Sequence, residues 1–185
     1  MIKYLIFDLD GTIADSKAIG IRCLTKALKD YGYTINRKVI NKLIGTKIPD
    51  LLKEIGVDKR YSGVISEKFY RYAKEEVLNN GIKPCVSLKP LKNLSKEYPL
   101  ILISNSENVF ILASIKELDI KELFKELYGA EEFKTKDEIL RKLFKKYKIK
   151  PSEAAYIGDR FSDVRSAKKV GCVSVAISNK CSWTD

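Results

Sequence analysis

The sequence predicts an α/β protein with a doubly wound parallel sheet and an inserted helical segment. Four short apolar runs lack polar–apolar alternation, which is typical of strands buried on both faces. Helical patterns separate the later runs, and strands that alternate with helices form parallel sheets. One long stretch contains helical patterns alone. The four apolar runs are residues 2–7, 100–103, 154–157 and 173–177.

Amphipathic helices are expected between the later strands. Their apolar residues recur at the three- and four-residue spacing that places them on one helix face. Gly171 should end the last of these helices, because glycine readily takes the left-handed conformation that closes a helix. The three expected helices cover residues 107–118, 136–147 and 163–170.

The stretch between the first strand and the rest predicts a helical cap. Ser16 stands at its start as a capping signal for the first helix. We therefore expect a helical cap over residues 15–83, inserted into an α/β core made of residues 1–14 and 84–185. The expected cap helices cover about residues 16–31, 37–44, 49–55 and 64–77.

Composition narrows the class of protein. The chain of 185 residues carries a net charge of +11, but its basic residues are dispersed and many have acidic neighbours. This pattern is typical of a solvated surface that weakly attracts small anions, so a nucleic-acid partner is not expected. No apolar run approaches the roughly 18–20 residues of a membrane span, and no signal peptide is evident. We expect a cytoplasmic protein with no membrane partner. The sequence leaves the oligomeric state open.

The absence of histidine limits the available chemistry. Without histidine, the chain has no Ser-His-Asp triad, no imidazole general base and no His-ligated zinc. The four cysteines are scattered and form no Cys-x-x-Cys pair, so buried free thiols are expected. Carboxylates, lysines, hydroxyls and backbone amides must therefore carry any catalysis.

Polar residues follow the expected strands at their carboxyl ends, where open parallel sheets bind ligands. Because these ends meet at one edge, the side chains should converge. A lysine, either Lys134 or Lys136, precedes the helix that leads into the 154–157 strand. The other residues of this group are Asp8, Asp10, Thr12, Ser104, Asn105, Asp159 and Asp163.

Clustered carboxylates point to a magnesium-dependent reaction on phosphate. Carboxylates repel one another unless a cation lies between them, and ligands that are all oxygen suit Mg²⁺. An aspartate beside such an ion can attack phosphorus and carry the phosphoryl group. A second aspartate two residues on can donate and accept the protons. Asp8 and Asp10 have this spacing. A calcium EF-hand loop is excluded, because its required glycine and glutamate positions hold Ile13 and Ile19.

These motifs, in this order, resemble the haloacid dehalogenase (HAD) superfamily of phosphohydrolases. The motifs are Asp8-x-Asp10-Gly11-Thr12, Ser104-Asn105, a lysine, and Gly158-Asp159-x-x-x-Asp163. The resemblance covers nearly the whole chain. The helical insert is similar to the C1 cap of phosphoglycolate phosphatases and β-phosphoglucomutases.

The resemblance implies a role for each motif residue. Asp8 would be the nucleophile and a metal ligand, and Asp10 the acid/base and a ligand through its backbone carbonyl. Ser104 and Asn105 would hold the phosphoryl oxygens. Lys136, favoured over Lys134 because it opens the amphipathic helix, would be the family lysine. Asp159 and Asp163 would complete the Mg²⁺ site. In the cap, Lys47 lies in a Gly-Thr-Lys loop where related caps contact the substrate, although a plain helix connection fits as well.

The expected function is hydrolysis of a small phosphate monoester through an aspartyl-phosphate on Asp8. A phosphomutase would use the same core residues and remains an alternative. A binding module that retains the fold, or a nucleic-acid-binding protein, is an alternative from another class. Arg160, next to the expected metal ligand, could contact substrate or form a salt bridge, and the sequence does not decide between them.

Overall fold

A computed structural model describes residues 1–182 and contains a five-stranded parallel sheet. Its order is β3-β2-β1-β4-β5, and every neighbouring pair is parallel. The sequence therefore predicted the fold class correctly. Residues 183–185, the end of the expected 84–185 core segment, lie outside the described residues. The strands are β1 (Tyr4–Phe7), β2 (Leu100–Ile103), β3 (Phe124–Tyr128), β4 (Ala154–Gly158) and β5 (Val173–Ala176).

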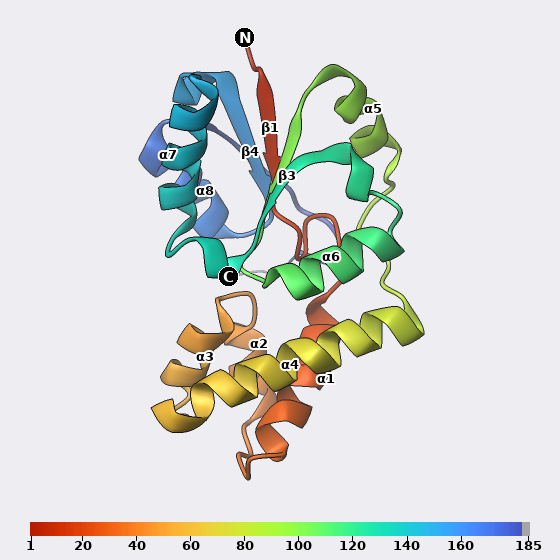
Figure 1. Cartoon of the computed structure of the whole chain (residues 1–185), viewed down its shortest axis with the longest axis vertical. Helices are drawn as coiled ribbons and strands as arrows, with labels where there is room; N and C mark the ends of the chain where they lie inside the picture. Colours follow the sequence, from red (N-terminus) through yellow and green to blue (C-terminus); the bar gives the residue numbers. More distant parts are fainter. Residues whose placement is uncertain (183–185) are drawn as a thin grey trace.

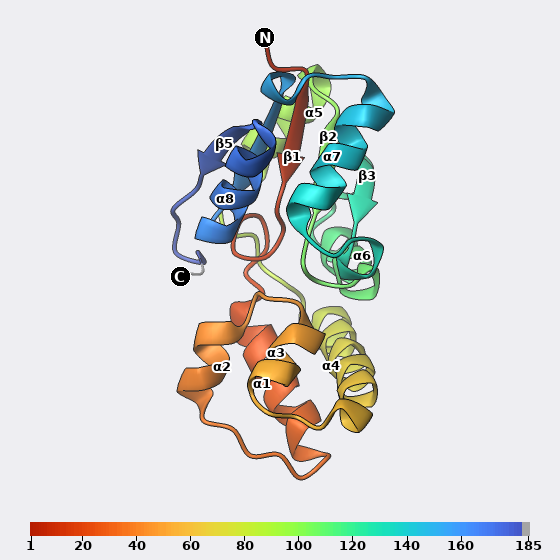
Figure 2. The same cartoon turned by 90° about the vertical axis from the view of Figure 1, so that its left-hand side faces the viewer.

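Eight α-helices and three 3₁₀ turns are found within the described residues. Figures 1 and 2 show α1 to α4 together beyond the carboxyl ends of the strands, away from the N-terminus. The helices are α1 (Lys17–Lys29), α2 (Arg37–Leu43), α3 (Ile48–Glu54), α4 (Lys59–Asn80), α5 (Lys89–Glu97), α6 (Asn108–Glu117), α7 (Lys136–Tyr147) and α8 (Phe161–Val170). The 3₁₀ turns are η1 (Lys121–Leu123), η2 (Ala130–Glu132) and η3 (Pro151–Glu153).

Successive strand residues face opposite sides of the sheet, and each side is covered by its own helices. Ile6 packs in one cluster with apolar residues of α7 and α8. Phe7 packs in the other cluster with residues of α5, α6 and the inserted helices. Burial of both faces explains the continuous apolar runs of β2 and β4. The run at residues 173–177 was expected to be buried in the same way, but β5 lies at the edge of the sheet, and its Val173 and Val175 are exposed.

Two antiparallel connections join the inserted helices to the sheet. The backbone N–H of Asp15 donates to the carbonyl of Lys83 (2.9 Å), and that of Cys85 donates to Ile13 (2.8 Å). Ala14 and Pro84 form an isolated bridge between them. The two joints therefore lie side by side, close to the residues at which the expected cap begins and ends. The boundaries of the cap as a separate domain stay a prediction.

Two elements were not predicted, and one helix start was wrong. The edge strand β3 has no continuous apolar run, and α5 is a short helix with one buried residue, Leu91. Helix α8 begins at Phe161, two residues before the expected start. The Asp163 carboxylate accepts the backbone N–H of Arg160 (3.1 Å) and so caps the first turn.

All four cysteines are buried free thiols, as expected. Within residues 1–182, no helix combines the length and the apolar character needed to cross a lipid bilayer.

Candidate active site

The loop that follows β1 places two carboxylates at the carboxyl edge of the sheet. Asp8 continues β1, and its backbone N–H donates to the carbonyl of Ile157 on β4 (2.8 Å). This bond holds Asp8 beside the end of β4. The side chains of Asp8, Asp10 and Thr12 are all buried.

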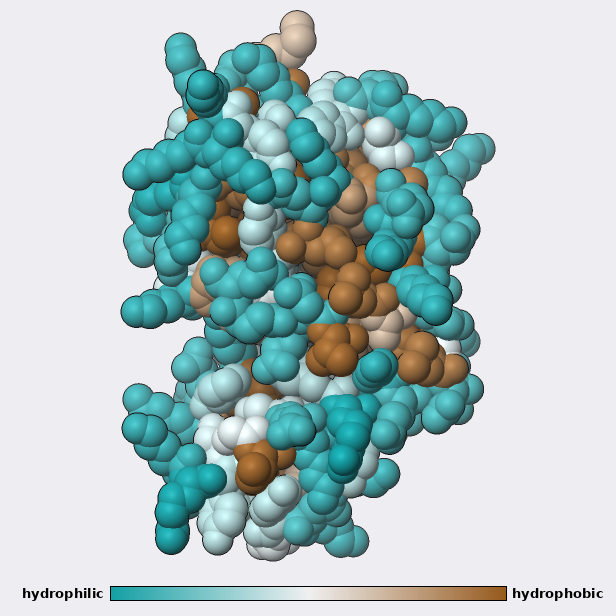
Figure 3. Space-filling view, viewed as in Figure 1, coloured by the Kyte–Doolittle hydropathy of each residue, from teal (hydrophilic) through white to brown (hydrophobic). Residues whose placement is uncertain are grey.

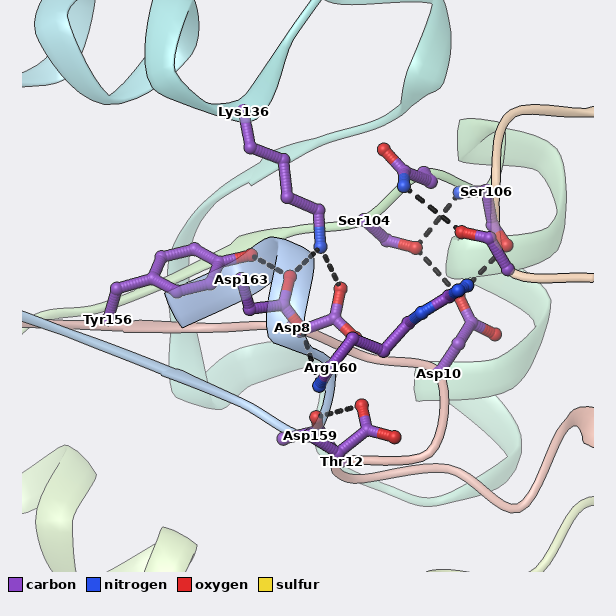
Figure 4. Close-up of polar contacts among 12 residues, drawn as sticks. Asp8, Asp10, Thr12, Ser104, Ser106, Lys136, Tyr156, Asp159, Arg160 and Asp163 are labelled. Carbon is purple, nitrogen blue, oxygen red and sulfur yellow. Dashed lines mark hydrogen bonds and ion pairs between the residues drawn. The ribbon is translucent and has the colours of Figure 1, made fainter. Parts of the chain in front are cut away.

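A buried lysine joins two of the carboxylates. Lys136, the first residue of α7, places its Nζ 2.6 Å from Asp8 Oδ1 and 2.7 Å from Asp163 Oδ1. Figure 4 shows the ammonium between the two acids. Lys134, the alternative family lysine, is exposed, and its backbone N–H donates to Glu138. The structure thus brings Lys136, and not Lys134, into the group.

Burial shapes the charges in this group. It raises the pKa of the Asp8 carboxyl well above its ordinary value, although the Lys136 ammonium opposes the shift. Burial by itself lowers the pKa of Lys136, but the carboxylates of Asp163 and Asp8 outweigh it and raise that pKa well above its ordinary value. Lys136 is therefore a permanent cation at neutral pH, placed where carboxylates would otherwise repel each other.

Three carboxylates are close enough to share a metal ion. One oxygen from each of Asp8, Asp159 and Asp163 lies within 4.8 Å of the others. Thr12 Oγ1 donates to Asp159 Oδ1 (3.0 Å) and orients that ligand. This all-oxygen set suits a hard divalent cation. The Asp10 carboxylate is not in the set, and the expected role of its backbone carbonyl stays a prediction.

Gly158 makes room for the Asp163 carboxylate at the end of β4. A Cβ atom at Gly158 would lie 2.5 Å from Asp163 Oδ2 and 2.6 Å from its Cγ. Any side chain at this position would therefore displace the carboxylate. The glycine in the Gly158-Asp159 motif thus has a steric reason.

Three hydroxyl groups hold the Asp10 carboxylate. Ser16 Oγ donates to Oδ1 (2.6 Å), and Ser104 and Ser106 donate to Oδ2 (2.7 and 2.9 Å). Ser16 was expected to cap α1, but its side chain makes no capping hydrogen bond. Ser106 was not predicted as a site residue. Its position two residues after Ser104, at the same strand end, was the available signal.

Tyr156 is a second residue that the sequence did not reveal. Its side chain is fully buried under the site, with its Oη 3.5 Å from Asp163 Oδ1 and its ring centroid 5.6 Å from Lys136 Nζ. Figure 4 shows the phenol directed at this pair. It lies in an apolar strand, where an aromatic residue predicts only core packing.

The residues expected to contact substrate lie where the loop between α2 and α3 meets the segments that follow β2 and β3. Asn105 Nδ2 donates to the carbonyl of Gly45 (3.0 Å) in the loop between α2 and α3. Lys47, from the same loop, donates to the carbonyls of Ala130 and Phe133. Its ammonium is therefore bound to core backbone in this conformation, and substrate binding by Lys47 stays a prediction.

A small cavity of about 30 Å³ adjoins the Asp10 carboxylate. Ser16, Gly45, Phe69 and Ser106 contribute to its walls, which come from both the helical insert and the core. A volume of this size holds one or two water molecules. The arrangement as a whole gathers carboxylates, a lysine and hydroxyls at the carboxyl edge of the sheet, and the cavity adjoins the Asp10 end of this group.

Comparison with known proteins identifies the family to which this chain is similar. A family model described as haloacid dehalogenase-like hydrolase matches residues 5–177. A phosphoglycolate phosphatase from Vibrio vulnificus is 25% identical over 197 residues, which cover 96% of this chain and 84% of that protein. One from Aquifex aeolicus is 26% identical over 185 residues, covering 92% and 82%.

Solved structures share the fold. CbbY from Rhodobacter sphaeroides, crystallised with phosphate, superposes with a TM-score of 0.87 at 16% identity, covering 98% of this chain and 88% of that chain. A predicted phosphoglycolate phosphatase from Haemophilus somnus gives a TM-score of 0.81 at 20% identity, covering 99% and 87%. Because both structures are less than 25% identical to this chain, they support its fold alone.

Proposed function

Because this chain belongs to the haloacid dehalogenase-like hydrolase family, as its resemblance predicted, we propose that it hydrolyses a small phosphate monoester through a phosphoryl intermediate on Asp8. One observation carries the proposal: the buried Lys136 ammonium contacts Asp8 and Asp163, while Asp159 completes a three-carboxylate group at the same point. The relatives named phosphoglycolate phosphatase support a phosphate ester as the substrate.

A divalent cation, for which Mg²⁺ is our proposal, fits the carboxylates of Asp8, Asp159 and Asp163. Their oxygen donors match the ligand preference of Mg²⁺, and the chain contains no histidine to favour zinc. When bound, the ion would offset the negative charge of the phosphoryl group and of the carboxylates. Asp10 would add its backbone carbonyl.

The first step forms a bond from an Asp8 carboxylate oxygen to phosphorus and breaks the bond from phosphorus to the leaving oxygen. Asp10 donates a proton to that oxygen, so the alcohol leaves neutral. In the second step Asp10 takes a proton from water, the water oxygen attacks phosphorus, and the Asp8–phosphorus bond breaks. Inorganic phosphate leaves and both carboxyl groups regain their starting states.

The surrounding residues position these groups. The hydroxyls of Ser16, Ser104 and Ser106 fix the orientation of Asp10, which a group that moves two protons requires. Lys136 supplies fixed positive charge beside Asp8, where negative charge gathers in the transition state. Ser104 and Asn105 follow β2 and would turn from their present partners to the phosphoryl oxygens when substrate binds, and Ser16 and Ser106 would then keep Asp10 oriented.

The small cavity beside Asp10, at about 30 Å³, admits no phosphate ester unless the helical insert moves. The choice of ester to test first therefore comes from the relatives named phosphoglycolate phosphatase. A two-carbon phosphorylated acid, phosphoglycolate, is the first substrate to test. We propose that residues 15–83 act as a cap that opens for entry and closes to exclude water.

Phosphate release from a panel of esters tests this function. The panel contains phosphoglycolate, p-nitrophenyl phosphate, sugar phosphates and nucleotides, each with Mg²⁺ or with EDTA. We expect Mg²⁺-dependent release that is greatest for a small ester and absent in Asp8→Asn. Release that is unaffected by EDTA, or retained in Asp8→Asn, would refute the assignment.

A further inference from the structure

Three side chains connect the loop between α2 and α3 to the core: two come from the core, and one comes from the loop itself. Arg160 Nη1 donates to the carbonyl of Ile44 (3.1 Å) and Asn105 Nδ2 donates to that of Gly45 (3.0 Å). Lys47 reaches the opposite way, to carbonyls in the segment after β3. Gly45 has a φ of +99°, a backbone conformation that favours glycine at this turn.

Arg160 differs from the other two donors because its backbone also contacts one of the three clustered carboxylates. Its N–H donates to Asp163 Oδ2 (3.1 Å), and it directly follows Asp159. Figure 4 shows its side chain running from the Asp159 end of the site toward the Asp10 end. One residue thus connects the candidate metal ligands with a cap carbonyl 116 positions away in sequence.

The carbonyl that Arg160 binds belongs to a residue that lines the small cavity beside Asp10. Ile44 and Gly45 both line the space beside Asp10. A guanidinium group suits this contact, because it is always charged and its planar donors keep a fixed geometry. The position of the cavity wall therefore depends on where the loop after β4 holds Arg160.

We propose that Arg160 is a positioning residue that couples the metal-binding loop to closure of the cap. This inference rests on the proposed function and assigns a role to a residue that the motifs leave undecided. An ion held by Asp159 and Asp163 would fix the backbone on both sides of Arg160. The fixed guanidinium would then hold Ile44 and the cavity wall in the closed position.

Hydrogen–deuterium exchange measures this coupling without turnover. The variant Arg160→Met keeps an apolar stem and removes the side-chain donors, and Arg165→Met, within the neighbouring helix α8, is the matched control. The amides of residues 43–48 are followed with and without Mg²⁺. We expect Mg²⁺ to slow exchange about tenfold in wild type and in Arg165→Met, the equivalent of one hydrogen bond from a charged donor. In Arg160→Met this protection should be lost, while peptides from β1 and β4 exchange as in wild type.

Steady-state kinetics provides the second readout. With the best ester of the panel, we expect Arg160→Met to raise KM about tenfold and to change kcat by less than about twofold, because closure contributes to binding. Arg165→Met should match wild type.

Three outcomes would overturn the inference. Unchanged Mg²⁺ protection of residues 43–48 in Arg160→Met would remove the coupling. A rise in KM with unchanged protection would assign Arg160 to direct substrate contact. A fall in kcat alone would place it in the chemical step. Activity retained in Asp8→Asn would refute the proposed function instead, and the exchange result would still decide the role of Arg160.

Discussion

Replacement of Lys136 by methionine tests the charge arrangement of the site. The ammonium lies 2.6 and 2.7 Å from carboxylates of Asp8 and Asp163, and the side chains of these three residues are 7%, 5% and 1% exposed. Loss of one partner from a buried ion pair costs about 3–5 kcal/mol. We expect Lys136→Met to lose about 3 kcal/mol of stability in the metal-free protein. This is the lower end of the range, because Asp8, whose pKa is already raised, can take up a proton.

Magnesium should reduce this loss. Without the ammonium, the carboxylates attract a cation more strongly, so Lys136→Met should bind Mg²⁺ about tenfold more tightly, which restores about 1.4 kcal/mol. Phosphate release should nevertheless fall at least about 100-fold, because a fixed positive charge at the reacting group is missing.

Urea unfolding followed by circular dichroism, in EDTA and in saturating Mg²⁺, measures the effect. Lys142→Met is the matched control on the same helix, because Lys142 pairs with Glu138 (2.8 Å) at an exposed position. This control should lose less than about 0.5 kcal/mol. Equal losses in the two variants, or a loss in Lys136→Met that is the same in EDTA and Mg²⁺, would refute the reasoning.

Three further predictions concern neighbouring features. Gly158→Ala places a Cβ 2.5 Å from Asp163 Oδ2. Isothermal titration should therefore show an affinity for Mg²⁺ that is about tenfold lower, and urea unfolding should show a stability loss of about 1–3 kcal/mol. Unchanged affinity would contradict the steric argument. Ser106→Ala removes one of three hydroxyl donors to Asp10. It should lower kcat/KM about fivefold and cost no more than about 1 kcal/mol of stability, as expected for one hydrogen bond; an unaltered kcat/KM would exclude the role. Burial raises the pKa of Asp137, but ion pairs with cations of α7 and α8 outweigh it and lower this pKa to about 2. Because the pKa is lower in the folded protein than the ordinary value of 3.8, the ionised carboxylate stabilises the fold at pH values above about 4. Asp137→Asn should therefore cost about 1–2 kcal/mol of stability at pH 7, after allowance for the exposed partners, and this difference should disappear as the pH falls from about 4 to 2. Unfolding curves at a series of pH values check this sign, and a difference that grows on acidification would contradict it.

The buried strands could be predicted because burial on both faces leaves a continuous apolar run. The edge strand β3 has no such constraint: Lys125 is exposed and Glu126 pairs with Lys146 from α7. Its two adjacent charged residues break both a continuous apolar run and a regular polar–apolar alternation, so the segment carried no strand signal. The charges also protect this edge from pairing with another chain.

The group at the carboxyl edge could be anticipated because parallel strands end together. The precise partners could not, since they depend on distances between segments far apart in sequence. Ser16 illustrates this limit: a serine before a helix predicts a cap, yet Asp10 lies 2.6 Å from its hydroxyl and takes the hydrogen bond instead. Tyr156 shows the same limit, because its hydroxyl approaches Asp163 from an otherwise apolar strand, on the face of the sheet that α7 and α8 cover.

The central claim is that the phosphoryl group passes through Asp8, and an acid-quench experiment tests it most directly. Enzyme and the best ester are mixed with Mg²⁺, quenched within one turnover, digested and mapped by mass spectrometry. We predict a phosphoryl group on Asp8 in wild type, and none on the corresponding peptide of Asp8→Asn. A phosphoryl group on a different residue, or wild-type turnover by Asp8→Asn, would contradict the account.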